Sequence, residues 1–152
     1  YAKYFVVQNL IAVRKEFDEP IDAMIYLMSA AMGFAALENA LFSFPILRGE
    51  FFAGLELIAG RFLGANLLHV LASGVFGYFI ARAYLSPWRR AIIAGGLIIA
   101  TLLHTAFNYL ILIRETLTQG AWYLVLFFMV LAVIVFAEFE RLRRKRVNLV
   151  HQ

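Results

Sequence analysis

The sequence IDAMIYLMSAAMGFAALENALFSF, residues 21–44, decides the fold. Its 24 residues include only two charged side chains, Asp22 and Glu38, and a run of this length matches the ~20 residues that span the hydrocarbon core of a bilayer. Three further apolar runs follow at residues 62–85, 91–113 and 121–137, with 24, 23 and 17 residues. We therefore predict an all-α fold, a polytopic bundle of transmembrane helices with about four full spans.

The composition of the whole chain also indicates a membrane protein. Hydrophobic residues make up 63% and charged residues 16% of the 152 residues, whereas soluble domains are typically ~45–50% apolar and ~25% charged. A fifth run, residues 4–13, gives only roughly 15 Å of helix and cannot span a bilayer alone. Because the chain begins at Tyr1, we expect a first helix that has lost its opening turns; an interfacial helix is the alternative. Residues 1–152 are predicted to form a single domain.

The Lys and Arg residues predict the orientation of the bundle, because cytoplasmic loops carry the excess of positive charge. If the five runs alternate across the membrane, 10 of the 14 Lys and Arg residues fall on one side, and five of these ten belong to a basic tail at residues 138–152. We therefore expect an integral membrane protein whose tail is cytoplasmic and lies against anionic lipid. The basic residues adjoin membrane exits without interleaved aromatic residues, which argues against nucleic-acid binding.

Three polar groups interrupt the apolar runs: Glu38 with Asn39, His69 with Ser73, and His104 with Asn108. An ionisable side chain inside a bilayer is expensive and therefore marks a candidate functional site. At about 1.5 Å of rise per residue, Glu38, His69 and His104 lie about 9, 10 and 13 Å from the outer ends of their runs. Three segments thus place ionisable side chains in one layer of the outer half of the membrane.

Spacing along each helix places further side chains beside this layer, because residues four apart share a helix face. The pairs are His69 with Ser73, with Asn66 on the same side, His104 with Asn108, and Phe34 with Glu38. Small residues nearby, among them Gly33 and Gly95-Gly96, allow helices to approach closely. A lone His, Asn or Ser in a membrane helix most often forms an interhelical hydrogen bond that holds two helices together, so a purely structural role stays open.

One carboxylate, two imidazoles and an amide suit hydrolysis inside the membrane. A carboxylate in a low-dielectric site can act as general base on water, and imidazole and amide groups can donate hydrogen bonds to the developing oxyanion. Alternatively, Glu38, His69 and His104 could hold a divalent metal such as zinc, which would activate the water. A hypothesis from another class is a non-enzymatic haem- or ion-binding protein, with His69 and His104 as axial ligands of a haem.

Several motifs follow one another between Tyr1 and about residue 110. They are EPID at residues 19–22, GFAALEN at residues 33–39, a histidine at 69, and H-x-x-x-N at residues 104–108. In this order they resemble the PrsW-type intramembrane proteases, bacterial and archaeal relatives of the CAAX-processing and bacteriocin-protection membrane proteases. The F-x-x-x-E-N element with the upstream EPID is the most specific part of the resemblance.

The resemblance implies a hydrolase of a prokaryotic plasma membrane. It would be an endopeptidase that cleaves a single-pass, membrane-anchored regulator, such as an anti-sigma factor, on its extracytoplasmic side. The implied site residues are Glu38, His69, His104 and Asn108, and we expect support from Lys3, Phe34, Asn39, Asn66 and Ser73.

The family's first motif is two adjacent glutamates, two variable residues and a lysine. The segment Tyr1-Ala2-Lys3 matches only its last three positions. The resemblance therefore implies that the glutamate pair lies before Tyr1 and that this chain lacks the principal base. A metal-bound water and a glutamate-activated water both remain open as mechanisms.

Overall fold

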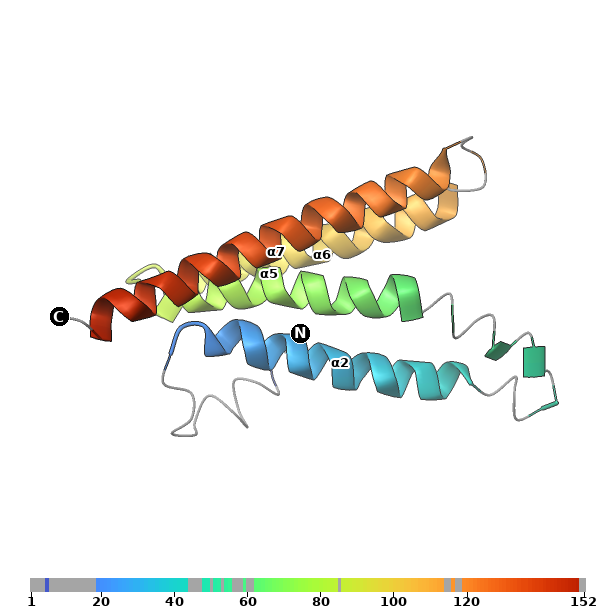
Figure 1. Cartoon of the computed structure of the whole chain (residues 1–152), viewed down its shortest axis with the longest axis horizontal. Helices are drawn as coiled ribbons and strands as arrows, with labels where there is room; N and C mark the ends of the chain where they lie inside the picture. The colour runs from blue at the N-terminus through green and yellow to red at the C-terminus, as the bar shows by residue number, and fades with distance from the viewer. Residues whose placement is uncertain are drawn as a thin grey trace.

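A computed structural model describes residues 5, 19–43, 48–49, 51–52, 54–55, 59, 62–84, 86–113, 116 and 119–150. The long helices are α2 (Asp22–Phe42), α5 (Leu67–Tyr84), α6 (Arg89–Ile113) and α7 (Gly120–Val150), as Figure 1 shows. A π-helical turn, η2 (Phe62–Asn66), leads directly into α5. Within the described residues there is no strand, and the predicted all-α class is confirmed.

Four helices are long and apolar enough to cross a membrane. Their spans are Asp22–Phe42, Gly64–Tyr84, Arg89–Ile113 and Gly120–Arg144. They coincide with the four apolar runs of the sequence, so the prediction of about four full spans is confirmed. Apart from Phe5, the short run at residues 4–13 lies outside the described residues, and so does Lys3.

The last helix continues beyond the apolar run that ends at residue 137. α7 extends to Val150, through most of the stretch that the sequence analysis assigned to a basic tail. Arg141 pairs with Glu138 at 3.3 Å, and Arg143 pairs with Glu140 at 2.9 Å. Side chains three residues apart are neighbours on a helix surface, so these pairs favour continuation of the helix. The basic stretch up to Val150 is therefore part of the last helix.

α5 is the central helix of the bundle, because it packs against α2, α6 and α7. In an apolar 18-residue window of its span 56% of the residues are buried, against 17%, 11% and 17% in the corresponding windows of α2, α6 and α7. The outer three helices thus expose apolar faces, as helices in contact with lipid tails do. The side chains of α5 have mainly protein neighbours.

Two glycines set the distance between α5 and its neighbours. A Cβ atom on Gly77 would lie 2.6 Å from Cα of Met24 in α2, and one on Gly96 of α6 would lie 2.5 Å from Cβ of Phe79. Only glycine permits backbones to approach this closely. Gly33 and Gly95, which the sequence suggested for the same purpose, have no atom within 4 Å of a Cβ position.

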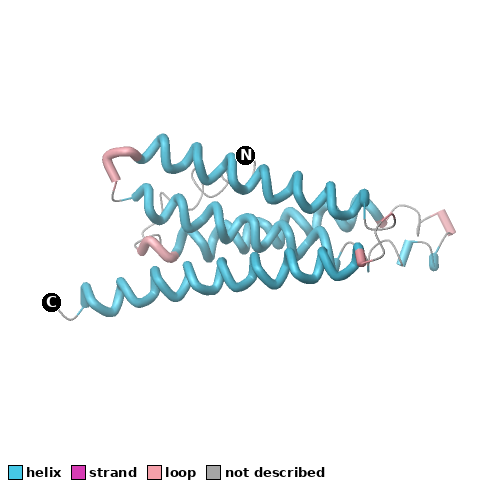
Figure 2. The backbone as a smooth tube through the Cα atoms, turned by 90° about the horizontal axis from the view of Figure 1, so that it is seen from above, coloured by secondary structure: helices cyan, strands magenta, loops and turns pink. Residues whose placement is uncertain are grey.

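The four long helices run along the long axis of the molecule (Figure 2). α6 and α7 both pack against α5, and in Figure 1 both diverge from α2 toward the end that holds the α6–α7 connection. Glu38 lies near the C-terminal end of α2, and His69 lies near the start of α5. Both residues therefore belong to the half of the bundle where the two helix pairs separate.

Candidate functional site

Glu38, His69 and His104 form a hydrogen-bonded row across three helices. Oε2 of Glu38 on α2 lies 2.8 Å from Nε2 of His69 on α5. Nδ1 of the same imidazole lies 3.1 Å from Nε2 of His104 on α6. Nδ1 of His104 lies 3.0 Å from the backbone oxygen of Ala100, one turn earlier on α6. The three ionisable side chains that the sequence placed in one layer are thus brought into direct contact.

The carbonyl group of Ala100 determines how this row is protonated. It can only accept a hydrogen bond, so Nδ1 of His104 carries a proton and donates it. Nε2 of a neutral His104 is then an acceptor, and Nδ1 of His69 donates to it. One further proton lies between Nε2 of His69 and Oε2 of Glu38, held by the imidazole or by the carboxyl group. In both arrangements the row has no net charge, which suits a site inside a bilayer.

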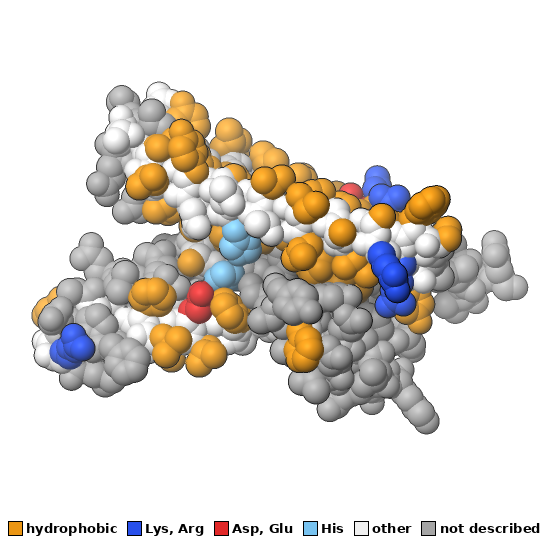
Figure 3. Space-filling view, turned by 180° about the vertical axis from the view of Figure 1, so that it is seen from behind, with side chains coloured by type: hydrophobic (Ala, Val, Ile, Leu, Met, Phe, Trp, Pro, Cys, Tyr) orange, Lys and Arg blue, Asp and Glu red, His pale blue; other side chains and the backbone are white. Residues whose placement is uncertain are grey.

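The row is partly sheltered but remains open on the side of Glu38. The side chain of His69 is 13% exposed and that of Glu38 is 29% exposed. The ring of Phe34 meets the imidazole of His69 edge to face, with ring centroids 5.3 Å apart. Figure 3 shows the acidic and histidine side chains together at the base of a hollow between the two diverging arms of the molecule. A water molecule or an extended peptide could therefore reach the carboxylate.

A second polar contact joins α2 to the π-helical turn beside the row. Nδ2 of Asn39 donates to Oδ1 of Asn66 across 3.2 Å. Oδ1 of Asn39 is buried and has no hydrogen-bond partner among the described residues. π-Helical turns are frequent at functional sites because they redirect side chains within a helix. Here η2 presents Asn66 to α2 just before α5 begins.

Of the other predicted site residues, Asn108 and Ser73 make none of the hydrogen bonds of the row. Asn108 is exposed on α6, and among the described residues no hydrogen bond connects it to Glu38, His69 or His104. Ser73 is buried within α5, one turn beyond His69. Lys3 lies outside the described residues. Asn108 and Ser73 therefore remain candidates on the basis of position alone.

The donor atoms of the row are of the types that zinc prefers, one carboxylate and two imidazoles. Their arrangement, however, directs the two nitrogens of His69 to different partners, Glu38 and His104. Across the part of the chain that the structure describes, no three His, Asp or Glu side chains form a group that could hold a metal ion. In this arrangement the described residues do not fit a three-ligand metal site.

The contact between the two imidazoles also bears on the haem hypothesis. Axial ligands of a haem lie on opposite faces of the macrocycle, so the haem separates them. Here the ring nitrogens of His69 and His104 are 3.1 Å apart and hydrogen-bonded, with ring centroids 5.2 Å apart. The arrangement leaves no space for a haem between the two rings.

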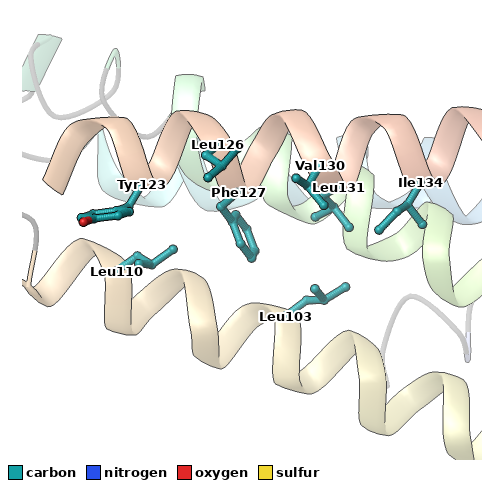
Figure 4. A pocket seen from close by; sticks show the side chains of 8 residues that line it. All are labelled: Leu103, Leu110, Tyr123, Leu126, Phe127, Val130, Leu131 and Ile134. Atoms are coloured by element: carbon teal, nitrogen blue, oxygen red, sulfur yellow. The ribbon is translucent and has the colours of Figure 1, made fainter. Parts of the chain in front are cut away.

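An apolar groove of about 320 Å³ lies between α6 and α7 (Figure 4). The side chains that line it are Leu103, Leu110, Tyr123, Leu126, Phe127, Val130, Leu131 and Ile134. Leu103 is the neighbour of His104 along the chain, but the lining has no carboxylate or imidazole. The groove therefore offers no acid–base chemistry of its own.

Two parts of the site were missed by sequence reasoning. The carbonyl of Ala100 is a backbone group, so no side-chain motif predicts its hydrogen bond with His104. The π-helical turn η2 brings Asn66 to Asn39, and the spacing of residues along the sequence did not predict this turn. Gly64 lies within this turn, and a Cβ atom on it would lie 3.3 Å from the ring of Phe107 on α6.

Comparison with known proteins places the chain among membrane proteases. Residues 1–135 match the family described as PrsW family intramembrane metalloprotease. Protease PrsW of Geobacillus kaustophilus is 30% identical over 132 residues, which cover 86% of this chain and 54% of that protein. Protease PrsW of Bacillus subtilis is 27% identical over 111 residues, covering 72% and 48%. Protease PrsW of Clostridioides difficile is 26% identical over 115 residues, covering 74% and 47%.

The chain spans about half the length of the curated relatives it matches. No solved structure matches it. The family match covers the helices that carry Glu38, His69 and His104. The chain therefore belongs to the PrsW family of intramembrane metalloproteases.

Proposed function

We propose that the chain is the site-bearing part of an intramembrane endopeptidase that hydrolyses a peptide bond in a membrane-anchored protein. The observation that carries the proposal is the hydrogen-bonded row of Glu38, His69 and His104, which three spans build inside an apolar bundle. The family and the name of the relatives, Protease PrsW, support the same reaction class.

The row supplies a shared proton at the reaction centre. The pair formed by Glu38 and His69 can take a proton from an attacking water and return it to the leaving nitrogen. His104 orients the imidazole of His69, because its own Nδ1 is fixed to the carbonyl of Ala100. Asn108 lies one turn beyond His104 and is the proposed donor to the oxyanion.

We further propose that the site works in the extracytoplasmic half of the membrane. The row lies in the half of the bundle where the helix pairs diverge, away from the arginines at the α5–α6 turn and the end of α7. Under the positive-inside rule the arginine-rich end is cytoplasmic. The proposed substrate is a single-pass regulator, of the anti-sigma-factor kind, cut near its outer membrane boundary.

The test uses the full-length protein in proteoliposomes with a single-pass substrate. We expect Glu38→Gln and His104→Ala each to lower the cleavage rate by about 10²–10⁴, the usual contribution of positioned acid–base groups. Thr105→Ala is the matched control for His104, because Thr105 is the exposed neighbour and bonds only the backbone oxygen of Thr101. Glu140→Gln is the control for the loss of a carboxylate. Full activity in both site variants would overturn the proposal.

A further inference from the structure

A second cluster of charged side chains lies at the opposite end of the bundle from the row. Its centre is Tyr78 on α5, whose side chain is buried in the hydrophobic core. Nη1 of Arg141 on α7 donates to the phenol oxygen of Tyr78 across 3.1 Å. The guanidinium carbon of Arg82 on α5 lies 5.9 Å from the centroid of the same ring. Two helices therefore bring one arginine each to a single fixed tyrosine.

The positive charge of this cluster is only partly neutralised. Arg141 pairs with Glu138, and its side chain is still 62% exposed. Arg82 is exposed, and within the described residues no carboxylate pairs with it. A guanidinium that is weakly hydrated and not paired is well suited to bind a phosphate group. Lys and Arg side chains gather at this end of the molecule in Figure 3.

The cluster lies at the level where lipid headgroups would meet the protein. Arg82 is in the last turn of α5, and Arg141 follows the end of the apolar run of α7 by one turn. Trp88 and Tyr84, in the adjacent α5–α6 turn and at the end of α5, are 75% and 53% exposed. Exposed Trp and Tyr side chains favour the membrane–water interface. A phosphate bound between the two arginines would therefore belong to a lipid of the same leaflet.

We propose that Arg82 and Arg141, held around Tyr78, form a binding site for the phosphate headgroup of an anionic phospholipid. Tyr78 fixes the guanidinium of Arg141 through its hydroxyl group and supports that of Arg82 through its ring. The bound lipid would add to the connection between α5 and α7 that Arg141 makes with Tyr78. The site is independent of the proteolytic reaction.

The experiment measures the thermal unfolding of the detergent-purified full-length protein against the concentration of added phosphatidylglycerol. Phosphatidylcholine and inorganic phosphate are the comparison ligands. We expect saturable stabilisation by phosphatidylglycerol and none of comparable size by the other two. One basic side chain near an anionic lipid contributes about five-fold in affinity, so Arg82→Gln/Arg141→Gln should weaken binding about 25-fold.

The matched control is Arg143→Gln/Arg144→Gln, which removes the same charge from side chains that face Glu140. We expect a clearly smaller loss of affinity than in Arg82→Gln/Arg141→Gln, because Arg143 and Arg144 face Glu140 and neither contacts Tyr78. Tyr78→Phe keeps both charges and the ring, and should weaken binding because Arg141 loses its hydroxyl partner. Equal losses in both double variants, or equal stabilisation by inorganic phosphate, would overturn the proposal.

Discussion

The amide oxygen of Asn39 lies buried without a hydrogen-bond partner in the described part of the chain, although the nitrogen of the same side chain is bonded to Asn66. An unpaired buried polar atom usually costs about 1–3 kcal/mol. The contact between the two amides contributes less than that, since interhelical hydrogen bonds in membrane proteins average about 0.6 kcal/mol. Asn39, which follows Glu38 in the chain, therefore contributes little to the free energy of unfolding.

The cost of the unpaired oxygen predicts which of two substitutions, Asn39→Leu or Asn66→Leu, lowers the free energy of unfolding more. Asn39→Leu removes the unpaired oxygen along with the hydrogen bond, whereas Asn66→Leu leaves both polar atoms of Asn39 unpaired in the protein. We expect Asn66→Leu to lower the free energy of unfolding by about 1–2 kcal/mol more than Asn39→Leu. Unfolding in mixed micelles measures both values, and the double variant gives the coupling between them. The opposite order would show that Asn39 finds a partner in the folded protein.

Among the helices, the approach of α5 to α2 depends on the missing side chain of Gly77. A Cβ atom there would meet backbone atoms of Met24 and Ala23, which cannot rotate away. We expect Gly77→Ala to lower the free energy of unfolding by about 1–3 kcal/mol, the usual cost of overpacking. Gly33→Ala is the control, because it adds the same methyl group where no atom lies within 4 Å. Thermal unfolding of the two variants measures the difference, and equal midpoints would contradict the close approach.

The positions of the helices could be predicted from the sequence because the length of each apolar run sets the length of a span. The expected runs at residues 21–44 and 91–113 correspond to α2 and α6 within two residues at each end. The extent of α7 was not predicted, because hydrophobicity ends at residue 137 whereas the helix is continued by ion pairs such as that of Glu138 with Arg141. Backbone hydrogen bonding, which decides between a π turn and an α turn at Phe62–Asn66, leaves no mark on hydrophobicity.

For the whole molecule, the distribution of arginines predicts which end faces the cytoplasm. The chain has no cysteine, so single cysteines can report the position of each connection. We expect a membrane-impermeant maleimide to label the Thr116→Cys variant on intact cells. The Pro87→Cys variant, in the α5–α6 turn, should be labelled only after the membrane is opened. Labelling of Pro87→Cys on intact cells would reverse the orientation.

Of the whole site, only the depth of its residues within the membrane could be predicted from the sequence. Counting residues from the ends of the runs placed Glu38, His69 and His104 in one layer, and the structure brings them into contact. The four-residue spacing along α6 grouped Asn108 with His104, and the rotation of α6 leaves Asn108 exposed. Rotation about a helix axis depends on packing contacts such as Gly96 against Phe79, which spacing along one helix does not encode.

The neutrality of the row also determines how it responds to the electrical potential across the membrane. That potential acts on a charge with about 2.3 kcal/mol per elementary charge per 100 mV across the full bilayer. A single carboxylate at the depth of Glu38 would feel a fraction of this energy. The row formed with His69 and His104 has no net charge, and its shared proton moves only between two atoms that are 2.8 Å apart. The electric field of an energised cell therefore does almost no work on the row, whichever of the two groups holds the proton.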